Sequence, residues 1–164
     1  MPLIPGVWHN DAMRTIHRDI VGGFIFSKDN KVLLGKNRQG GVYEGSYVVP
    51  GGGVDDGETK HQALVREMQE ETGIDITLGE ITEINTATGE HEKTLRDTGE
   101  RVHVNMTFFD YSIALPQDAD SIVVRAEDDW TSPRWFTADE LATENIGLPT
   151  CRTLQKIGFM NPIA

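Results

Sequence analysis

One stretch, residues 50–74, limits what this chain can fold into more than any other. It opens with Pro50 and three consecutive glycines, a residue type that tolerates backbone angles a side chain would forbid. From about Glu58 the chain runs without proline or glycine through good helix formers, and Gly73 is the residue type that commonly ends a helix. The sequence therefore predicts a tight loop that leads directly into one long helix.

Three glutamates of this predicted helix share one of its faces. Glu67, Glu70 and Glu71 stand three and four residues apart, so their side chains leave the helix on the same side. Like charges at that spacing repel by roughly 0.2–0.5 kcal/mol per pair, and many acidic helix faces are simply solvated surface. Carboxylates that converge beside a glycine loop are also what a hard divalent cation needs. The spacing by itself fits both interpretations.

The order of residues over the whole stretch favours the metal site. Gly52 is followed after five residues by Glu58, and after seven more by Arg66 and Glu67; two further glutamates, Gly73 and two apolar residues hold the remaining positions. At every fixed position the stretch is similar to the signature of the Nudix hydrolases. The resemblance implies an α+β fold, a Nudix-like α/β/α sandwich with a mixed β-sheet between helices. It also implies an acid anhydride hydrolase that uses Mg²⁺, with Mn²⁺ as the alternative.

The resemblance also assigns roles to single residues. Arg66 is expected to hydrogen-bond a glutamate of the helix and hold it in place. Glu58 begins the helix, where a carboxylate also suits the positive end of the dipole, so a structural role and a role in binding metal or substrate both stay open. The ligands are expected to be oxygens, which suit Mg²⁺ better than Zn²⁺ because no cysteine or histidine shares the acidic face. The expected ligands are the carbonyl of Gly51 and the side chains of Glu67, Glu70 and Glu71.

This ligand set predicts the reaction class. A divalent cation on a diphosphate neutralises charge and lowers the pKa of a bound water, and in-line attack by water on phosphorus then splits a P–O–P link. A carboxylate must accept the proton. Any of the three helix glutamates could serve, and Nudix enzymes often recruit an acid from a loop ahead of a late-strand tryptophan. In this chain that acid is Asp129, with Glu127 as the second choice, although the loop also reads as a solvated acidic turn.

Substrate contacts leave a weaker pattern. Lys36 and Arg38 follow a predicted strand and are expected to meet phosphates, unless they are ordinary loop cations. The expected substrate is a nucleoside diphosphate derivative, with a (deoxy)nucleoside triphosphate cleaved to the monophosphate and pyrophosphate as the first choice.

Two alternatives remain open. Residues 31–36, 49–52 and 135–137 also resemble nucleotide-sugar hydrolases of the GDP-mannose type. Those enzymes usually lack some of the glutamates found here, and Asn37 stands where they have an arginine. The other alternative is a nucleotide-binding regulator without activity, which loss of the acidic residues would mark; none is lost.

Composition sets the outer bounds. The 164 residues suffice for one domain, 1–164, with a proper core. A formal net charge of −11 argues against a nucleic-acid polymer as partner, whereas bound cations would reconcile an acidic protein with a small nucleotide. One cysteine, Cys151, the lack of a signal peptide and the lack of an apolar run of roughly 20 residues predict a cytoplasmic protein away from membranes.

Hydrophobic patterns and turn residues predict the remaining elements. Residues 1–16 are expected to form an irregular arm, available to a partner subunit as in a homodimer. Residues 86–100 are expected to form a long polar hairpin loop and 126–133 an acidic loop. Thr137, with Glu140 three residues later, predicts a capped helix start. Strands are predicted over 18–27, 31–35, 47–49, 74–85, 101–115 and 122–125, and a last helix over 149–157.

Overall fold

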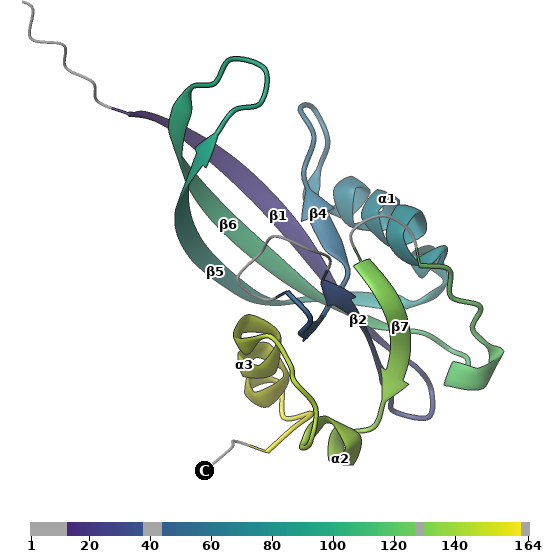
Figure 1. Ribbon diagram of the computed structural model, residues 1–164. Coiled ribbons are helices and arrows are strands. Elements are labelled where there is room, and N and C mark those ends of the chain that lie inside the picture. Colours follow the sequence, from purple (N-terminus) through teal and green to yellow (C-terminus); the bar gives the residue numbers. More distant parts are fainter. Residues whose placement is uncertain (1–12, 38–43, 127–129, 162–164) are drawn as a thin grey trace, which may run out of the picture.

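The computed structural model describes residues 13–37, 44–126 and 130–161 (Figure 1). Over these ranges, seven strands form one mixed sheet in the order β3-β2-β1-β6-β5, with β4 paired to β1 and β7 to β2. The strands are β1 Arg14–Phe26, β2 Val32–Asn37, β3 Tyr47–Val48, β4 Gly51–Gly53, β5 Glu80–Thr94, β6 Arg101–Ala114 and β7 Trp130–Phe136. The helices are α1 Lys60–Thr72, α2 Ala138–Leu141 and α3 Leu148–Lys156, with short 3₁₀ turns at Ile76–Leu78 and Ala119–Ser121.

The sheet has a hydrophobic core on each face, because successive strand residues point to opposite sides. On one face, Val21 and Ile25 of β1 pack with Leu64 and Met68 of α1. On the other face, Phe24 of β1 packs in a second core that includes residues of β2, β7, α2 and α3. Figure 1 shows α1 and α3 at separate places around the sheet. The expected α+β arrangement, a mixed sheet between helices, is confirmed.

Local signals set the ends of α1. Thr59 is the N-cap and forms a capping box with Gln62: the Thr59 hydroxyl accepts from the Gln62 amide, and the Gln62 side chain accepts from the Thr59 amide. Gly73 ends the helix in the left-handed conformation, with φ 72°. The predicted stop at Gly73 is confirmed. The helix begins at Lys60, so Glu58, which was expected to begin it, lies before the N-cap instead.

The predicted hairpin loop over 86–100 is wrong. Strand β5 continues through Thr94, and only residues 95–100 form the turn to β6. The extension pairs with β6 from Thr86 opposite Phe109 to Thr94 opposite Arg101. Its stability comes from backbone hydrogen bonds and cross-strand pairs, including the ion pair between Glu92 and Arg101, so it needs no apolar stripe.

Other boundaries also differ from the predictions. Strand β1 starts at Arg14, inside the stretch expected to be an irregular arm, because residues 14–26 pair in parallel with β6. Residues 122–125 form no strand: Ile122 packs against the α1 core, and the Arg125 amide donates to the Thr72 carbonyl at 2.8 Å. Strand β5 begins only at Glu80, after a 3₁₀ turn. Residues 130–133, expected in a loop, belong to β7 because they pair with β2.

The end of the chain follows the prediction. Thr137 caps α2 in a capping box with Glu140, and α3 occupies the region of the last predicted helix.

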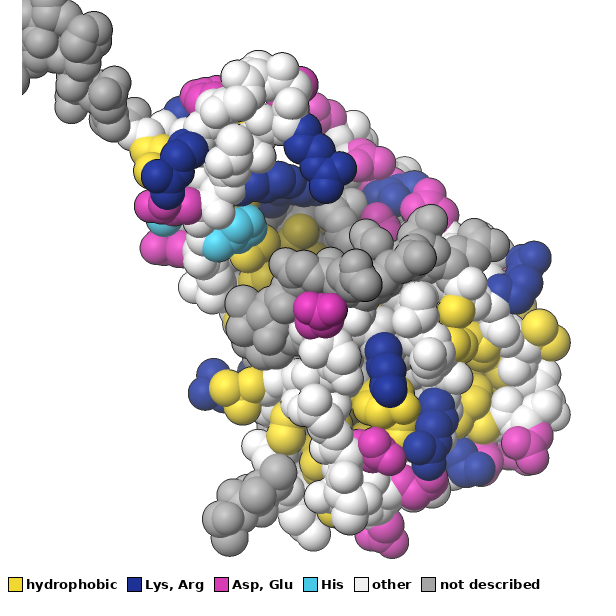
Figure 2. All heavy atoms as spheres, viewed as in Figure 1, with side chains coloured by type: hydrophobic (Ala, Val, Ile, Leu, Met, Phe, Trp, Pro, Cys, Tyr) yellow, Lys and Arg dark blue, Asp and Glu magenta, His cyan; other side chains and the backbone are white. Residues whose placement is uncertain are grey.

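None of the described helices is long and apolar enough to cross a membrane. Figure 2 shows a hollow on one face of the molecule, bordered by hydrophobic side chains, basic side chains and a histidine.

Candidate active site

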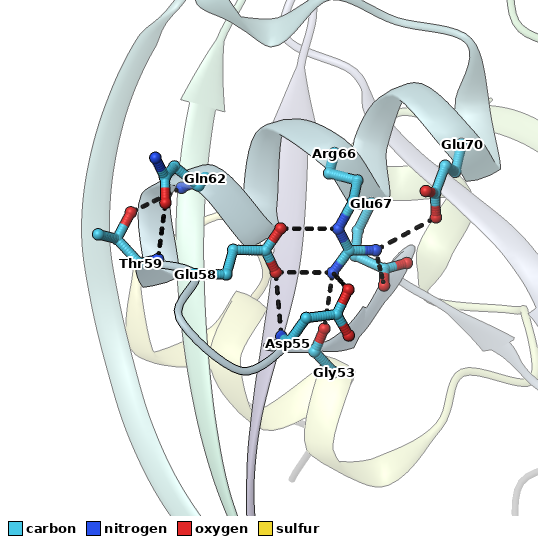
Figure 3. Close-up of polar contacts among 8 residues, drawn as sticks. All are labelled: Gly53, Asp55, Glu58, Thr59, Gln62, Arg66, Glu67 and Glu70. Atoms are coloured by element: carbon cyan, nitrogen blue, oxygen red, sulfur yellow. Dashed lines mark hydrogen bonds and ion pairs between the residues drawn. The ribbon is translucent and has the colours of Figure 1, made fainter.

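Arg66 is the centre of the polar contacts along α1 (Figure 3). Two parallel contacts join it to Glu58, from Nε to Oε2 and from Nη2 to Oε1, both at 2.8 Å. Its Nη1 donates to Glu67 Oε1 at 2.8 Å and to Glu70 Oε2 at 3.3 Å, and its Nη2 donates to the Gly53 carbonyl at 2.9 Å. One planar guanidinium therefore ties the entry to α1, two helix glutamates and strand β4 into one unit.

Glu58 lies in the turn before α1 and has both carboxylate oxygens engaged. Besides Arg66, it accepts the Asp55 amide at 3.0 Å. The hydrogen bonds from Arg66, followed by the one from the Asp55 amide, lower the pKa of Glu58 to about 2. In this geometry Glu58 positions Arg66, and its predicted contact with substrate stays a prediction.

Glu67 lies between α1 and β4, which consists of Gly51–Gly53 and is called the glycine strand below. Of the Glu67 side chain, 13% is exposed. A Cβ atom at Gly52 would collide with the Glu67 carboxylate, so glycine at this position lets the carboxylate lie directly against β4. Burial raises the pKa of Glu67, and the contact with Arg66 opposes that rise. The expectation that Arg66 holds a glutamate of the helix is thus met by a direct contact.

The side chain of Glu71 contacts Gly51, the first residue of β4. Its Oε2 accepts the Gly51 amide at 2.7 Å. In an antiparallel ladder the N–H and C=O of one residue point to the same edge of the strand, so the Gly51 carbonyl also lies on the edge that meets Glu71. The predicted carbonyl ligand and one predicted carboxylate ligand are therefore neighbours.

The donors suit a hard divalent cation in type and in charge. Asp55, Glu58, Glu67 and Glu70 share one guanidinium, which leaves an excess of negative charge made of oxygen donors alone. No three acidic, histidine or cysteine side chains of the described chain converge in a metal-holding arrangement. In this geometry Arg66 engages two of the predicted ligands and the β4 backbone engages the third, Glu71.

Of the predicted phosphate-binding cations and loop acids, only Lys36 lies among the described residues. Lys36 is exposed on β2, with its Nζ 5.4 Å from the centre of the Tyr47 ring. Arg38, Asp129 and Glu127 lie outside the described residues. Their roles stay predictions.

Asp55 is a member of the site that the sequence patterns did not single out. Its Oδ2 lies 3.5 Å from Arg66 Nη2, and its amide binds Glu58. The only local signal is its position three residues before Glu58, a spacing at which a side chain can accept a backbone amide.

Comparisons with known proteins identify the family. A model of the NUDIX domain matches residues 16–152. The ADP-ribose pyrophosphatase of Methanocaldococcus jannaschii is 32% identical over 126 residues, which make up 77% of this chain and 66% of that protein. The nucleoside triphosphatase NudI of Escherichia coli K12 is 28% identical over 138 residues, which make up 83% of this chain and 94% of that protein.

A solved structure shares the fold. The NUDIX domain of Shewanella oneidensis NrtR, in complex with ADP ribose, has a TM-score of 0.63 and 16% sequence identity, over 87% of this chain and 86% of that chain. The family match spans most of the chain and includes the glycine strand, Arg66 and the three helix glutamates. The resemblance seen in residues 50–74 is confirmed, and the chain belongs to the NUDIX domain family.

Proposed function

We propose that this protein is a metal-dependent pyrophosphohydrolase that cleaves the P–O–P link of a nucleoside diphosphate derivative. The observation that carries the proposal is the arrangement of three glutamates of α1 beside the glycine strand, with Arg66 tied to Glu67, Glu70 and β4. The first candidate substrate is a (deoxy)nucleoside triphosphate, cleaved to the monophosphate and pyrophosphate. Its support is the relative matched over 94% of its length, which is named a nucleoside triphosphatase.

The chain's own residues divide the work. Gly51, Glu67, Glu70 and Glu71 would hold Mg²⁺ or Mn²⁺, which when bound neutralises phosphate charge and lowers the pKa of a bound water. Arg66 keeps Glu67 against the glycine strand, and burial raises the pKa of that carboxyl group. The candidates for the carboxylate that accepts the proton of this water are the three helix glutamates, Asp129 and Glu127.

A second candidate substrate is ADP-ribose. It is supported by the archaeal relative, named an ADP-ribose pyrophosphatase, and by the structural neighbour solved with ADP ribose. Both candidates contain the same reacting group, a diphosphate attached to a nucleoside. They differ in the group beyond the second phosphate, so their products separate them.

A product assay decides among these substrates. The protein with Mg²⁺ is incubated with nucleoside triphosphates, ADP-ribose, dinucleoside polyphosphates and GDP-mannose. Pyrophosphate release identifies the first candidate, and AMP with ribose 5-phosphate identifies the second. On GDP-mannose, cleavage of the P–O–P link gives GMP with mannose 1-phosphate, whereas free mannose with GDP identifies the nucleotide-sugar alternative. Tight nucleotide binding without turnover on any of these compounds would contradict the enzyme proposal and favour the regulator.

Substitution of Glu70 tests the acidic helix face directly. Glu70→Gln keeps the shape of the side chain and removes its charge. We expect turnover to fall by more than roughly 100-fold. Loss of a residue that only hydrogen-bonds to a metal ligand already lowers activity by about 10–100-fold, and Glu70 is expected to be a ligand itself. Glu80→Gln, a change at an exposed carboxylate on β5, is the matched control and should keep normal turnover. Normal activity of Glu70→Gln would remove this residue from the metal site.

A further inference from the structure

We propose that Arg18 on β1 binds the phosphate chain of the substrate. The residue lies outside the 50–74 stretch, and its placement against the glycine strand comes only from the tertiary structure. The inference deepens the proposed function and rests on it, because it adds a phosphate ligand to the same site.

The first observation is where the guanidinium lies. Ile20 of β1 pairs with Gly53 of β4, and Arg18 stands two residues earlier on the same face of the sheet. A Cβ atom at Gly53 would collide with Nη2 of Arg18. The arginine head group therefore fills the space that a side chain at position 53 would take.

The second observation is what lies on the other side of the same strand. Gly52 faces α1, where a Cβ atom would meet the Glu67 carboxylate, and Gly53 faces Arg18. Since neighbouring strand residues point to opposite sides, the guanidinium and the carboxylate flank β4 within about 10 Å of each other. Two or three linked phosphates can bridge that distance.

The edge of β4 connects the two sides. Within the described residues, β4 has a paired strand on one side only, and that strand is β1. Its other edge carries the Gly51 amide, which binds Glu71, and the Gly53 carbonyl, which binds Arg66. A phosphate chain that crosses this edge meets the acidic ligands on one side and Arg18 on the other.

The third observation is the charge environment of Arg18. The residue is exposed, and within the described chain no carboxylate forms an ion pair or hydrogen bond with it. Arg14, on the same strand and the same face, is instead paired with Glu100 at 2.9 Å. In a chain of net charge −11, an open guanidinium fork beside a glycine strand suits bidentate binding of a phosphate.

The test compares three variants, Arg18→Ala, Arg18→Lys and the control Arg14→Ala. Calorimetry measures the dissociation constant for inorganic tripolyphosphate in the presence of Mg²⁺, and kinetics measure kcat/KM on the substrate that the product assay identifies. We expect Arg18→Ala to weaken both by roughly 10–100-fold, the usual effect of a lost hydrogen bond to a charged group. Arg18→Lys should fall between, because it keeps the charge and loses the fork, and Arg14→Ala should match the wild type.

Gly53 provides a second arm. Gly53→Ala places a Cβ atom where the Arg18 guanidinium lies and should displace the guanidinium. Made alone in the otherwise wild-type protein, this change should therefore weaken tripolyphosphate binding. In the Arg18→Ala background the same change should add little, because residues that act together show non-additive effects. Additive losses would contradict the proposal, because they would show that Gly53 acts independently of Arg18.

The failures of the two proposals are distinguishable. Equal tripolyphosphate affinity in Arg18→Ala and Arg14→Ala, or no measurable binding by the wild type, overturns the role of Arg18 even when hydrolysis is established. Absence of hydrolysis on every compound in the assay overturns the proposed function. The calorimetric comparison then still decides whether Arg18 binds phosphate.

Discussion

Arg66 shows how one residue can organise an acidic site. Its guanidinium reaches four carboxylates and the Gly53 carbonyl. Without it, Glu67 and Glu70 would repel each other across one turn of the helix. Planar, forked geometry allows these contacts to form at the same time, which a lysine could not match. The arginine therefore holds closely spaced carboxylates together by direct contacts.

Glu58 gives this network a pH signature. Its pKa is about 2 in the folded protein and 4.5 in the unfolded reference, so between these values the folded state binds fewer protons. The stabilisation from Glu58 is fully present above about pH 4.5 and is lost as the pH falls toward 2. Glu58→Gln should therefore be less stable than the wild type at neutral pH, and the difference should vanish in acid.

Urea denaturation at a series of pH values measures this difference. The midpoints of wild type and Glu58→Gln should converge as the pH falls from 4.5 toward 2. A difference that stays constant over this range would show that the carboxylate has no lowered pKa.

At the scale of elements, α1 and β4 form the working unit. The helix is defined at both ends by its own caps, Thr59 and Gly73. The strand is three glycines long, which brings its backbone close to Glu67, to Glu71 and to Arg18. A rigid helix start fixes the direction in which the glutamates project, so the caps bear on the site as well as on stability.

Removal of the N-cap should be measurable. Thr59→Ala deletes the hydroxyl that accepts the Gln62 amide, and the expected cost is about 1 kcal/mol. For a chain of this size that lowers the Tm by about 2–4 °C. Thr59→Ser keeps the hydroxyl and should melt close to the wild type. Equal melting of Thr59→Ala and Thr59→Ser would show that the cap contributes nothing.

The whole molecule combines two cores with a large negative charge. One core packs between the sheet and α1, and the other packs between the opposite face of the sheet and α3. The acidic face of α1 lies at the surface, outside the first of these cores. With a net charge of −11, a bound divalent cation should stabilise the folded state, because the unfolded chain has no preformed site.

Metal addition therefore belongs in a stability experiment. Mg²⁺ at about 100 times its dissociation constant should stabilise the protein by about 2.7 kcal/mol, which raises the Tm by roughly 5–10 °C. The variant with glutamine at positions 67, 70 and 71 should lose this response. Sodium chloride at matched ionic strength separates general screening from specific binding. An equal rise in Tm with sodium chloride would contradict a specific metal site.

The sequence by itself determined the features whose interactions span only a few residues. The helix, its end at Gly73, and the box of Thr137 and Glu140 followed from local sequence, because each contact joins residues at most four apart. The Thr59 cap has the same short range, although the sequence patterns did not single it out. That the three glutamates share one helix face likewise followed from their spacing and from helix geometry. The family resemblance rested on the same continuous stretch.

Only the tertiary structure decided which distant segments meet. Polar residues 86–94 become strand because β6 offers them a complete ladder, whereas apolar Ile122 packs on a core and finds no partner strand. Arg18 reaches Gly53 because parallel and antiparallel pairing bring β1 between β6 and β4. Such contacts depend on the choice of partner strand over long sequence separations, and no local pattern encodes that choice.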